Sequence, residues 1–246
     1  MLKLPTMARS SPQATLRYET LSGHLDLLGF HGCPRMSQDG TTAFTDAAAT
    51  WNRRFEGDDF LFGAEPNEWL REHVAVWPPG GRILCVADGE GRNSVWLARQ
   101  GFVVDAFDIA EVGVAKARRF AARQGVNVNY SVADCANYDW PRASFDGVAA
   151  IFIQFADPAQ RERLFAHMTD SLKPGGTLVL QGYTPKQLEY RTGGPPHASH
   201  LYTPELLRQA FSGLEVIELR EYEADVAEGS GHRGRSALIG LVARRR

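Results

Sequence analysis

The sequence has few cysteines, little net charge and no long apolar run, and each absence narrows the class of protein. Its 246 residues include three unclustered cysteines, Cys33, Cys85 and Cys135, which argues against a disulfide framework and for a reducing compartment. The formal net charge of −2 gives no general basic surface for nucleic acid or an anionic membrane. No apolar stretch approaches the ~20 residues of a membrane span. We therefore expect a cytoplasmic protein with neither a nucleic-acid nor a membrane partner.

Metal-ligand spacing is also missing. No pair of histidines has the His-x-x-x-His spacing of a helical metal site, and His197 and His200 stand in a proline-rich loop that is a weak indication of zinc. We predict no metal. A hydrophobic content of 43% and a charged content of 23% are those of an ordinary globular protein. The length suits one α/β domain with a sizeable core.

The first 45 residues differ from the rest of the chain. Serine, proline and glycine interrupt every period there, so we expect residues 1–45 to be a poorly ordered extension. Met36 leaves open where the natural chain starts. Residues 46–246 are then expected to form the folded domain, with a helical lid at 46–78.

Strand and helix patterns alternate in this second part. The expected strands are 82–87, 102–107, 126–132, 146–153, 176–183, 214–222 and 235–243; the expected helices are 47–55, 66–76, 92–100, 111–124, 158–172 and 204–211. Pro66 suits a first helical position. Such alternation predicts a mostly parallel sheet with helices on both faces.

A glycine turn after the first of these strands is the most informative motif. The apolar run ends in Asp88-Gly89-Glu90-Gly91, and a helical pattern follows at once. Glycine there permits positive φ and lets a ligand approach the backbone. Asp108 ends the next strand about 20 residues further on, where a carboxylate can accept both hydroxyls of a ribose. Together they predict a nucleotide-binding corner, although each motif alone is also typical of ordinary turns.

The charges of the turn favour one nucleotide over another. Asp88 and Glu90 would repel a pyrophosphate, whereas they would attract the ammonium and sulfonium groups of S-adenosylmethionine. The third small position of a dinucleotide fingerprint is held by Ser94. An NAD(P)-dependent oxidoreductase is therefore the disfavoured alternative, and a domain that binds S-adenosylmethionine without catalysis is a second one.

In their order, these motifs resemble the class I S-adenosylmethionine-dependent methyltransferases over about residues 50–246. The turn at Lys173-Pro174-Gly175-Gly176, between a helix and an apolar strand, belongs to the same set. The resemblance implies a doubly wound, Rossmann-like sheet of order 3-2-1-4-5-7-6 with strand 7 antiparallel. It departs from the family at Cys85, where the first loop usually has an acid, and at Ala87, where it usually has a glycine. We expect alanine to be tolerated there.

A narrower resemblance concerns the front of the domain. Trp51, Phe55, Phe60 and Phe62 are similar in order to the front lid of tellurite-resistance-type and thiopurine or thiol methyltransferases. The alternative is that these aromatic residues only cover one side of the core. Both can hold, because an aromatic lid excludes water and offers π faces to a sulfonium.

The resemblance implies a set of cofactor-binding residues. Gly89 and Gly91 would admit the homocysteine part, Asp108 the ribose, Asp134 with its neighbour the adenine, and Gln154 would face the sulfonium. The full set is Trp51, Asp88, Gly89, Glu90, Gly91, Asn93, Asp108, Ile109, Asp134, Cys135 and Gln154.

Two polar, glycine-rich loops, 183–197 and 228–235, are expected to project over the cofactor's methyl group. The candidate catalytic residues in them are Tyr183, Arg191, His197 and His232, although each histidine alone also fits a surface loop. The predicted function is methyl transfer to a small-molecule acceptor. A soft nucleophile (a thiol, chalcogen or metalloid anion) would need alignment alone, whereas oxygen or nitrogen would usually require a base. The acceptor and the oligomeric state stay open.

Overall fold

The computed structural model describes residues 47–246. The extension predicted at 1–45, together with Cys33, lies outside the described residues. No helix within 47–246 is both long enough and apolar enough to cross a membrane.

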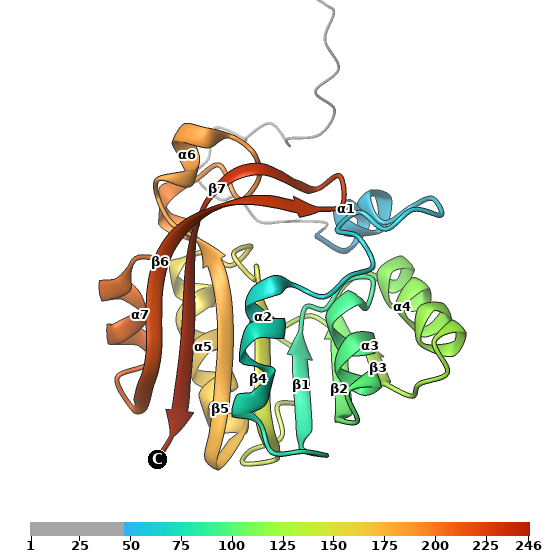
Figure 1. The fold of residues 1–246 in the computed structure, drawn as a ribbon, viewed down its shortest axis with the longest axis horizontal. Helices are drawn as coiled ribbons and strands as arrows, with labels where there is room; N and C mark the ends of the chain where they lie inside the picture. Colours follow the sequence, from blue (N-terminus) through green and yellow to red (C-terminus); the bar gives the residue numbers. More distant parts are fainter. Residues whose placement is uncertain (1–46) are drawn as a thin grey trace, which may run out of the picture. The chain divides into compact units, whose positions relative to one another are not determined.

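Seven strands form one sheet in the order β3-β2-β1-β4-β5-β7-β6, as predicted (Figure 1). Strands β1 to β5 pair in parallel, and β7 runs antiparallel to both β5 and β6. The strands are β1 (Arg82–Val86), β2 (Val103–Asp108), β3 (Asn129–Val132), β4 (Phe145–Ile151), β5 (Leu172–Tyr183), β6 (Leu214–Glu228) and β7 (His232–Arg245).

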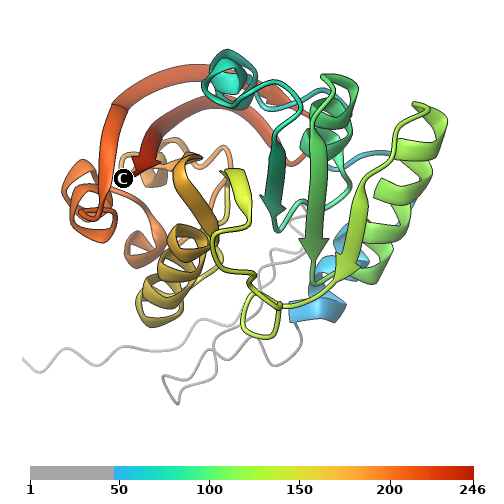
Figure 2. The same cartoon turned by 90° about the horizontal axis from the view of Figure 1, so that it is seen from below.

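Helices cover both faces of this sheet (Figure 2). They are α1 (Ala47–Arg54), α2 (Glu68–His73), α3 (Arg92–Arg99), α4 (Glu111–Arg123), α5 (Pro158–Ser171), α6 (Gln187–Tyr190) and α7 (Pro204–Ala210), with short 3-10 turns at Val74–Val76 and Ala198–His200. Side chains alternate across each strand. Leu84 and Val86 pack with α5 and α7, while Ile83 and Cys85 pack with α2, α3 and α4. The sheet is therefore buried on both sides, which explains the continuous apolar runs in its sequence.

Two predicted boundaries were wrong for local reasons. Helix α2 begins at Glu68, after Asn67, whose side chain accepts a hydrogen bond from the Leu70 amide; Pro66 therefore precedes the cap. Strand β3 begins at Asn129 because the Val126 amide bonds back to the Ala121 carbonyl, closing α4.

The last two strands are longer than their sequence pattern predicted. Expected to end at 222 and to resume at 235, they instead pair as far as Glu228 and His232, so most of the expected loop is a β-hairpin with its turn at 229–231. Strand β5 likewise includes residues 173–176, which were predicted to form a turn. Its register against β4 is irregular near this end. The extended hairpin curves over the carboxyl ends of the parallel strands toward α1 (Figure 1).

Candidate active site

The glycine turn joins β1 to α3 at the carboxyl edge of the sheet. Gly91 caps α3 with φ of 90°, and a Cβ there would lie 2.7 Å from the Cβ of Ala117. A Cβ at Gly89 would lie 3.2 Å from the ring of Phe55. Gly89 has φ of 62°, so both glycines of the motif are needed for their left-handed backbone as well as for their close packing.

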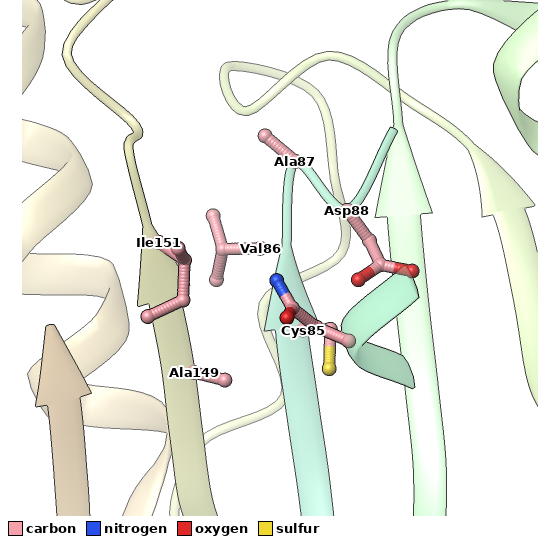
Figure 3. A pocket seen from close by; sticks show the side chains of 7 residues that line it. Cys85, Val86, Ala87, Asp88, Ala149 and Ile151 are labelled. Atoms are coloured by element: carbon pink, nitrogen blue, oxygen red, sulfur yellow. The ribbon is translucent and has the colours of Figure 1, made fainter. Parts of the chain in front are cut away.

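Ala87 adopts φ of 49°, the left-handed region that alanine disfavours. Alanine therefore carries a backbone cost at this position, which the glycine usual in the resembled family would avoid. That the cofactor still binds with alanine here stays a prediction. Ala87 lines a small pocket with Cys85, Val86, Asp88, Asn93, Ala149 and Ile151. Figure 3 shows the Asp88 side chain on the β2 side of the turn, away from Ile151.

Two carboxylates meet beside this pocket. Asp108 accepts hydrogen bonds from the amides of Gly89 (2.9 Å) and Ala110 (2.8 Å), and burial raises its pKa. Asp88 accepts from the hydroxyl and the amide of Ser94. Burial, together with the charge of Asp108, raises the pKa of Asp88 to about 7.

Neither acid forms an ion pair with a basic side chain within residues 47–246. Both retain lone pairs, because a carboxylate offers about four acceptor sites. Two partly desolvated carboxylates of like charge are stabilised by an incoming cation or by hydroxyl donors. This donor set fits the ammonium and ribose groups of S-adenosylmethionine.

Glu90, the second acid of the turn, is engaged elsewhere. Its carboxylate pairs with Lys116 (2.5 Å) and accepts from the Leu61 amide (2.8 Å). Lys116 also donates to the carbonyl oxygens of Phe55 and Asp59. Glu90 and Lys116 are 4% and 5% exposed, so this pair fastens the segment between α1 and α2 to the turn. Such a geometry argues against a direct contact of Glu90 with the cofactor.

Trp51, Ile109 and Asn93 were also predicted to bind the cofactor, and they lie near the front of the domain and around the glycine turn. Trp51 stacks on Phe55 with ring centroids 5.5 Å apart and lies 6.4 Å from the ring of Phe62, while Ile109 is half-buried directly after β2. Asn93 accepts from the Asn67 amide (2.9 Å), and thereby fixes the start of α2.

Asp134, Cys135 and Gln154 follow the ends of β3 and β4. Asp134 is exposed and accepts from the Ala136 amide (2.9 Å). Burial raises the pKa of Cys135 to about 12, so it is a neutral thiol. The side-chain amide of Gln154 bonds to both backbone groups of Tyr183 and to the His200 carbonyl. The prediction that Gln154 faces the sulfonium does not fit this arrangement, because its polar atoms hold the end of β5.

Among the four catalytic candidates, the fold brings two together. His232 is 8% exposed and Tyr183 1% exposed, and their rings are 5.7 Å apart and perpendicular. His197 and Arg191 are exposed. The ring contact of His197 is with His200, and no contact within residues 47–246 joins Arg191 to His232.

Aromatic side chains from distant segments enclose His232. Phe62 and Phe152 each lie 4.5 Å from it, centroid to centroid. Phe152, directly after β4, has φ of 56°, a strained conformation that turns up at functional sites. Burial lowers the pKa of His232, although Glu228 opposes this shift. Burial also raises the pKa of Tyr183, whose hydroxyl has no hydrogen-bond partner among the described residues.

The backbone of Gly193 packs closely against these two residues. A Cβ on Gly193 would lie 3.1 Å from the Tyr183 hydroxyl oxygen, 3.6 Å from the Gly231 carbonyl oxygen and 3.7 Å from Cδ2 of His232. A side chain at Gly193 would therefore crowd the Tyr183 hydroxyl and the His232 ring, and the glycine lets this loop pack against them.

The sequence reasoning missed Phe152, Arg92 and the role of Glu228. Phe152 has no sequence signal, because a positive φ cannot be predicted from a phenylalanine in the sequence. Glu228 had one: Gly229-Ser230-Gly231 reads as a hairpin turn, and a hairpin across it places Glu228 opposite His232.

Comparisons with known proteins agree with this fold. A family model described as a methyltransferase domain matches residues 83–176. The chain is 29% identical over 224 residues to a thiopurine S-methyltransferase of Azotobacter vinelandii, a match that covers 71% of this chain and 97% of that protein.

Two solved structures share the fold. An S-adenosylmethionine-dependent methyltransferase of Methanosarcina mazei superposes with a TM-score of 0.59 at 19% identity, over 74% of this chain and 98% of that one. TehB of Haemophilus influenzae superposes with a TM-score of 0.61 at 14% identity, over 81% and 67%. At these identities the structures show the fold alone, and the sequence matches support the methyltransferase activity. The chain is an S-adenosylmethionine-dependent methyltransferase, and its sequence is similar to thiopurine S-methyltransferases.

Proposed function

We propose that this enzyme methylates the sulfur of a small thiol bound between His232, Tyr183 and the aromatic residues Phe62 and Phe152. The observation that carries the proposal is a buried imidazole of lowered pKa beside an unpartnered Tyr183 hydroxyl, at the carboxyl edge of the sheet. The relative named thiopurine S-methyltransferase, which this chain covers almost end to end, supports sulfur as the acceptor atom.

On the donor side, we assign Asp108 to the ribose hydroxyls and Asp88 to the amino end of S-adenosylmethionine. Gly89 and Gly91 offer their backbone to the cofactor, and Ile109 forms an apolar wall beside it. Trp51 covers the front of the site. Asp134 and Cys135 lie toward the adenine. Asn93 and Glu90 hold the surrounding segments in place through Asn67 and Lys116. Bound S-adenosylmethionine supplies a methyl group on a positively charged sulfur.

On the acceptor side, His232 takes the thiol proton and the acceptor sulfur forms the new bond to the methyl carbon. The bond from that carbon to the donor sulfur breaks, and its electron pair stays on the donor sulfur, which becomes a neutral thioether. A neutral imidazole is the form that accepts a proton, and the lowered pKa of His232 keeps it in that form at neutral pH. The neutral Tyr183 hydroxyl can donate a hydrogen bond to the acceptor's polar group.

An acceptor panel tests this function. The purified protein is incubated with S-adenosylmethionine and aromatic thiols, aliphatic thiols, selenite, tellurite or phenols, and the release of S-adenosylhomocysteine is measured. We expect thiols to be turned over. Turnover of phenols alone would replace sulfur by oxygen as the acceptor atom. Tight binding of S-adenosylmethionine with no turnover of any compound would support the non-catalytic alternative.

The role of His232 is tested by comparing His232→Gln with His197→Gln, an exposed histidine of the neighbouring loop. For thiols whose pKa lies above the assay pH, His232→Gln should lower kcat about 10²-fold, the usual effect of removing a general base. For thiols already ionised, the loss should nearly vanish. His197→Gln should leave kcat unchanged in both series. Equal losses for ionised and un-ionised thiols would contradict proton transfer to His232.

A further inference from the structure

We infer that Glu228 is a positioning residue for methyl transfer, which holds His232 with its Nε2 lone pair toward the acceptor and ties it to the glycine turn through Arg92. The inference rests on the proposed function, because it assumes that His232 meets the acceptor. It concerns a residue that touches neither acceptor nor donor.

The carboxylate of Glu228 is surrounded by hydrogen-bond donors. One oxygen accepts from Nδ2 of Asn67 (2.9 Å), and the other from Arg92 (2.8 Å) and, at 3.5 Å, from Nδ1 of His232. An ionised carboxylate only accepts, so the contact with Nδ1 requires the proton on that nitrogen. Nε2 of the neutral ring is then left with its lone pair. The side-chain hydrogen bond of His232 within residues 47–246 is the one at Nδ1.

The charge of Glu228 survives its burial. Desolvation alone would raise the pKa of this carboxyl, but the hydrogen bond to His232 and the charge of Arg92 hold its pKa at about 2. Glu228 is therefore ionised throughout the working range. A general base oriented by a third, fixed acceptor is a recurring arrangement in enzymes.

The hairpin fixes the distance between the two residues. Glu228 and His232 are the last register pair of β6 and β7, on either side of a three-residue turn. The turn itself is held at the front of the site, because the Gly231 amide donates to the Leu61 carbonyl (2.9 Å). Backbone pairing thus places Glu228 beside His232 before any side chain contributes.

Arg92 links this pair to the donor side. It is the first residue of α3, directly after Gly91, and it is 7% exposed. Its guanidinium bonds to Glu228 and to the Phe62 carbonyl (3.2 Å). A single side chain therefore spans from the glycine turn to both the aromatic wall and the carboxylate that orients His232.

The first test reads the tautomer of His232 and needs no acceptor. In protein labelled with ¹⁵N at its seven histidines, long-range ¹H–¹⁵N spectra identify the protonated nitrogen, and His232→Gln assigns the signal. We expect Nδ1–H in the parent protein. Glu228→Ala should convert His232 to the Nε2–H form that free imidazole favours, whereas Glu228→Gln, which keeps an acceptor oxygen, should retain Nδ1–H.

The same spectra, followed against pH, give the pKa of His232. The charged groups that face this ring are Glu228, Arg92 and Arg54. Glu228→Ala should lower the pKa of His232 further, because the carboxylate is the group that raises it. Glu215→Gln is the matched control: Glu215 is an exposed acid at the other end of β6, paired with Arg244, and its loss should leave the tautomer and the pKa of His232 unchanged.

Kinetics then separate positioning from structural support. With a thiol acceptor, Glu228→Ala should lower kcat at least tenfold while the Kd of S-adenosylmethionine changes less than threefold, and Glu228→Gln should recover part of kcat. An Nε2–H tautomer in the parent protein, or one that Glu228→Ala leaves unaltered, overturns the inference whatever the activity. Absence of turnover in the parent with every thiol overturns the proposed function instead.

Discussion

Two regions at one edge of the sheet are built differently: the one proposed to bind the cofactor (residues 82–93 with Asp108, the cofactor corner) and the one proposed to bind the acceptor (Phe62, Phe152, Tyr183, Glu228 and His232, the acceptor corner). In the cofactor corner, Asp108 bonds to an amide 19 residues away and Asp88 to one 6 residues away. In the acceptor corner, Glu228 bonds to side chains 161 and 136 residues away. The first is one strand–turn–helix unit with its neighbouring strand; the second exists only once the chain has folded.

The two corners therefore also differ in how a sequence can specify them. Local geometry can be specified by a short motif, and it suits a donor shared by many enzymes. The acceptor corner depends on the length and curvature of the β6–β7 hairpin and on the segment before α2. We therefore expect changes in the cofactor corner to alter donor affinity and to have little effect on the KM of the acceptor. Changes in the acceptor corner should alter turnover and have little effect on donor affinity.

The largest effect should come from Asp108→Ala. The variant loses a carboxylate acceptor for two ribose hydroxyls, and hydrogen bonds to charged groups are worth about 1.5–3 kcal/mol each. Calorimetry should show the affinity for S-adenosylmethionine falling at least tenfold, while the KM of the acceptor, measured at saturating donor, stays the same. Unchanged donor affinity in the folded variant would remove Asp108 from the cofactor corner.

Gly229→Ala tests the acceptor corner by displacing the hairpin turn. Gly229 has φ of 64°, and a Cβ would lie 2.3 Å from the Leu61 carbonyl oxygen. The variant should lose about 1–2 kcal/mol for the left-handed backbone and about 1–3 kcal/mol more for overpacking. Urea unfolding measures the loss, and the acceptor's KM should rise with it.

Gly175→Ala is the matched control for that change. Gly175 also has positive φ, 80°, but a Cβ there would meet nothing within 4 Å. It should show the backbone cost of about 1–2 kcal/mol alone, with normal kinetics. Equal losses in the two variants would show that the hairpin turn does not press on the segment before α2.

The pH dependence of donor binding should sharpen the assignment of Asp88. Its pKa of about 7 means that it is mostly protonated at pH 6 and ionised at pH 8, and only the ionised form attracts the cationic donor. Affinity should therefore rise about tenfold from pH 6 to pH 8, and Asp88→Asn should abolish the rise.

Stability of the ligand-free protein should move in the opposite direction. The folded-state pKa of Asp88 is raised from the ordinary value of 3.8 to about 7, so folding binds a proton between these two pH values. The free energy of unfolding therefore falls as pH rises from the lower value to the higher one. Asp88→Asn should therefore raise the melting temperature at pH 8 and not at pH 4. A variant destabilised at pH 8 would show that Asp88 serves mainly as a partner for Ser94.

The smallest effect is expected for Ala87→Gly. Relief of the left-handed alanine should raise the free energy of unfolding by about 1 kcal/mol, because the backbone gain is partly offset by the entropy that glycine adds to the unfolded chain; donor affinity should be unchanged or improved. Ala143, which has φ of 47° outside both corners, supplies the comparison: Ala143→Gly should give a similar gain in stability and no change in affinity. A loss of stability in Ala87→Gly alone would mean that its methyl group is needed in the pocket at the end of β1.

The sequence by itself determined the sheet and the glycine turn that follows its first strand. Alternating strand and helix periods predicted the doubly wound core, and the family resemblance supplied the strand order that the structure confirms. The glycine turn and the acids around it are contiguous in the chain, so their geometry follows from local backbone preferences. The strain at Ala87 was missed because φ is set by the turn and not by the residue that occupies it.

Only the tertiary structure decided which residues of the later loops belong together. Tyr183, His197, His232 and Arg191 looked equivalent in the sequence, yet Tyr183 and His232 are buried side by side while the other two are exposed. The reason is the pairing of β6 with β7, which carries His232 over the sheet edge, and the buried amide of Gln154, which holds Tyr183 in place. The contacts of Gln154 with Tyr183 and of Phe62 with His232 join segments far apart in the chain, and no local pattern encodes them.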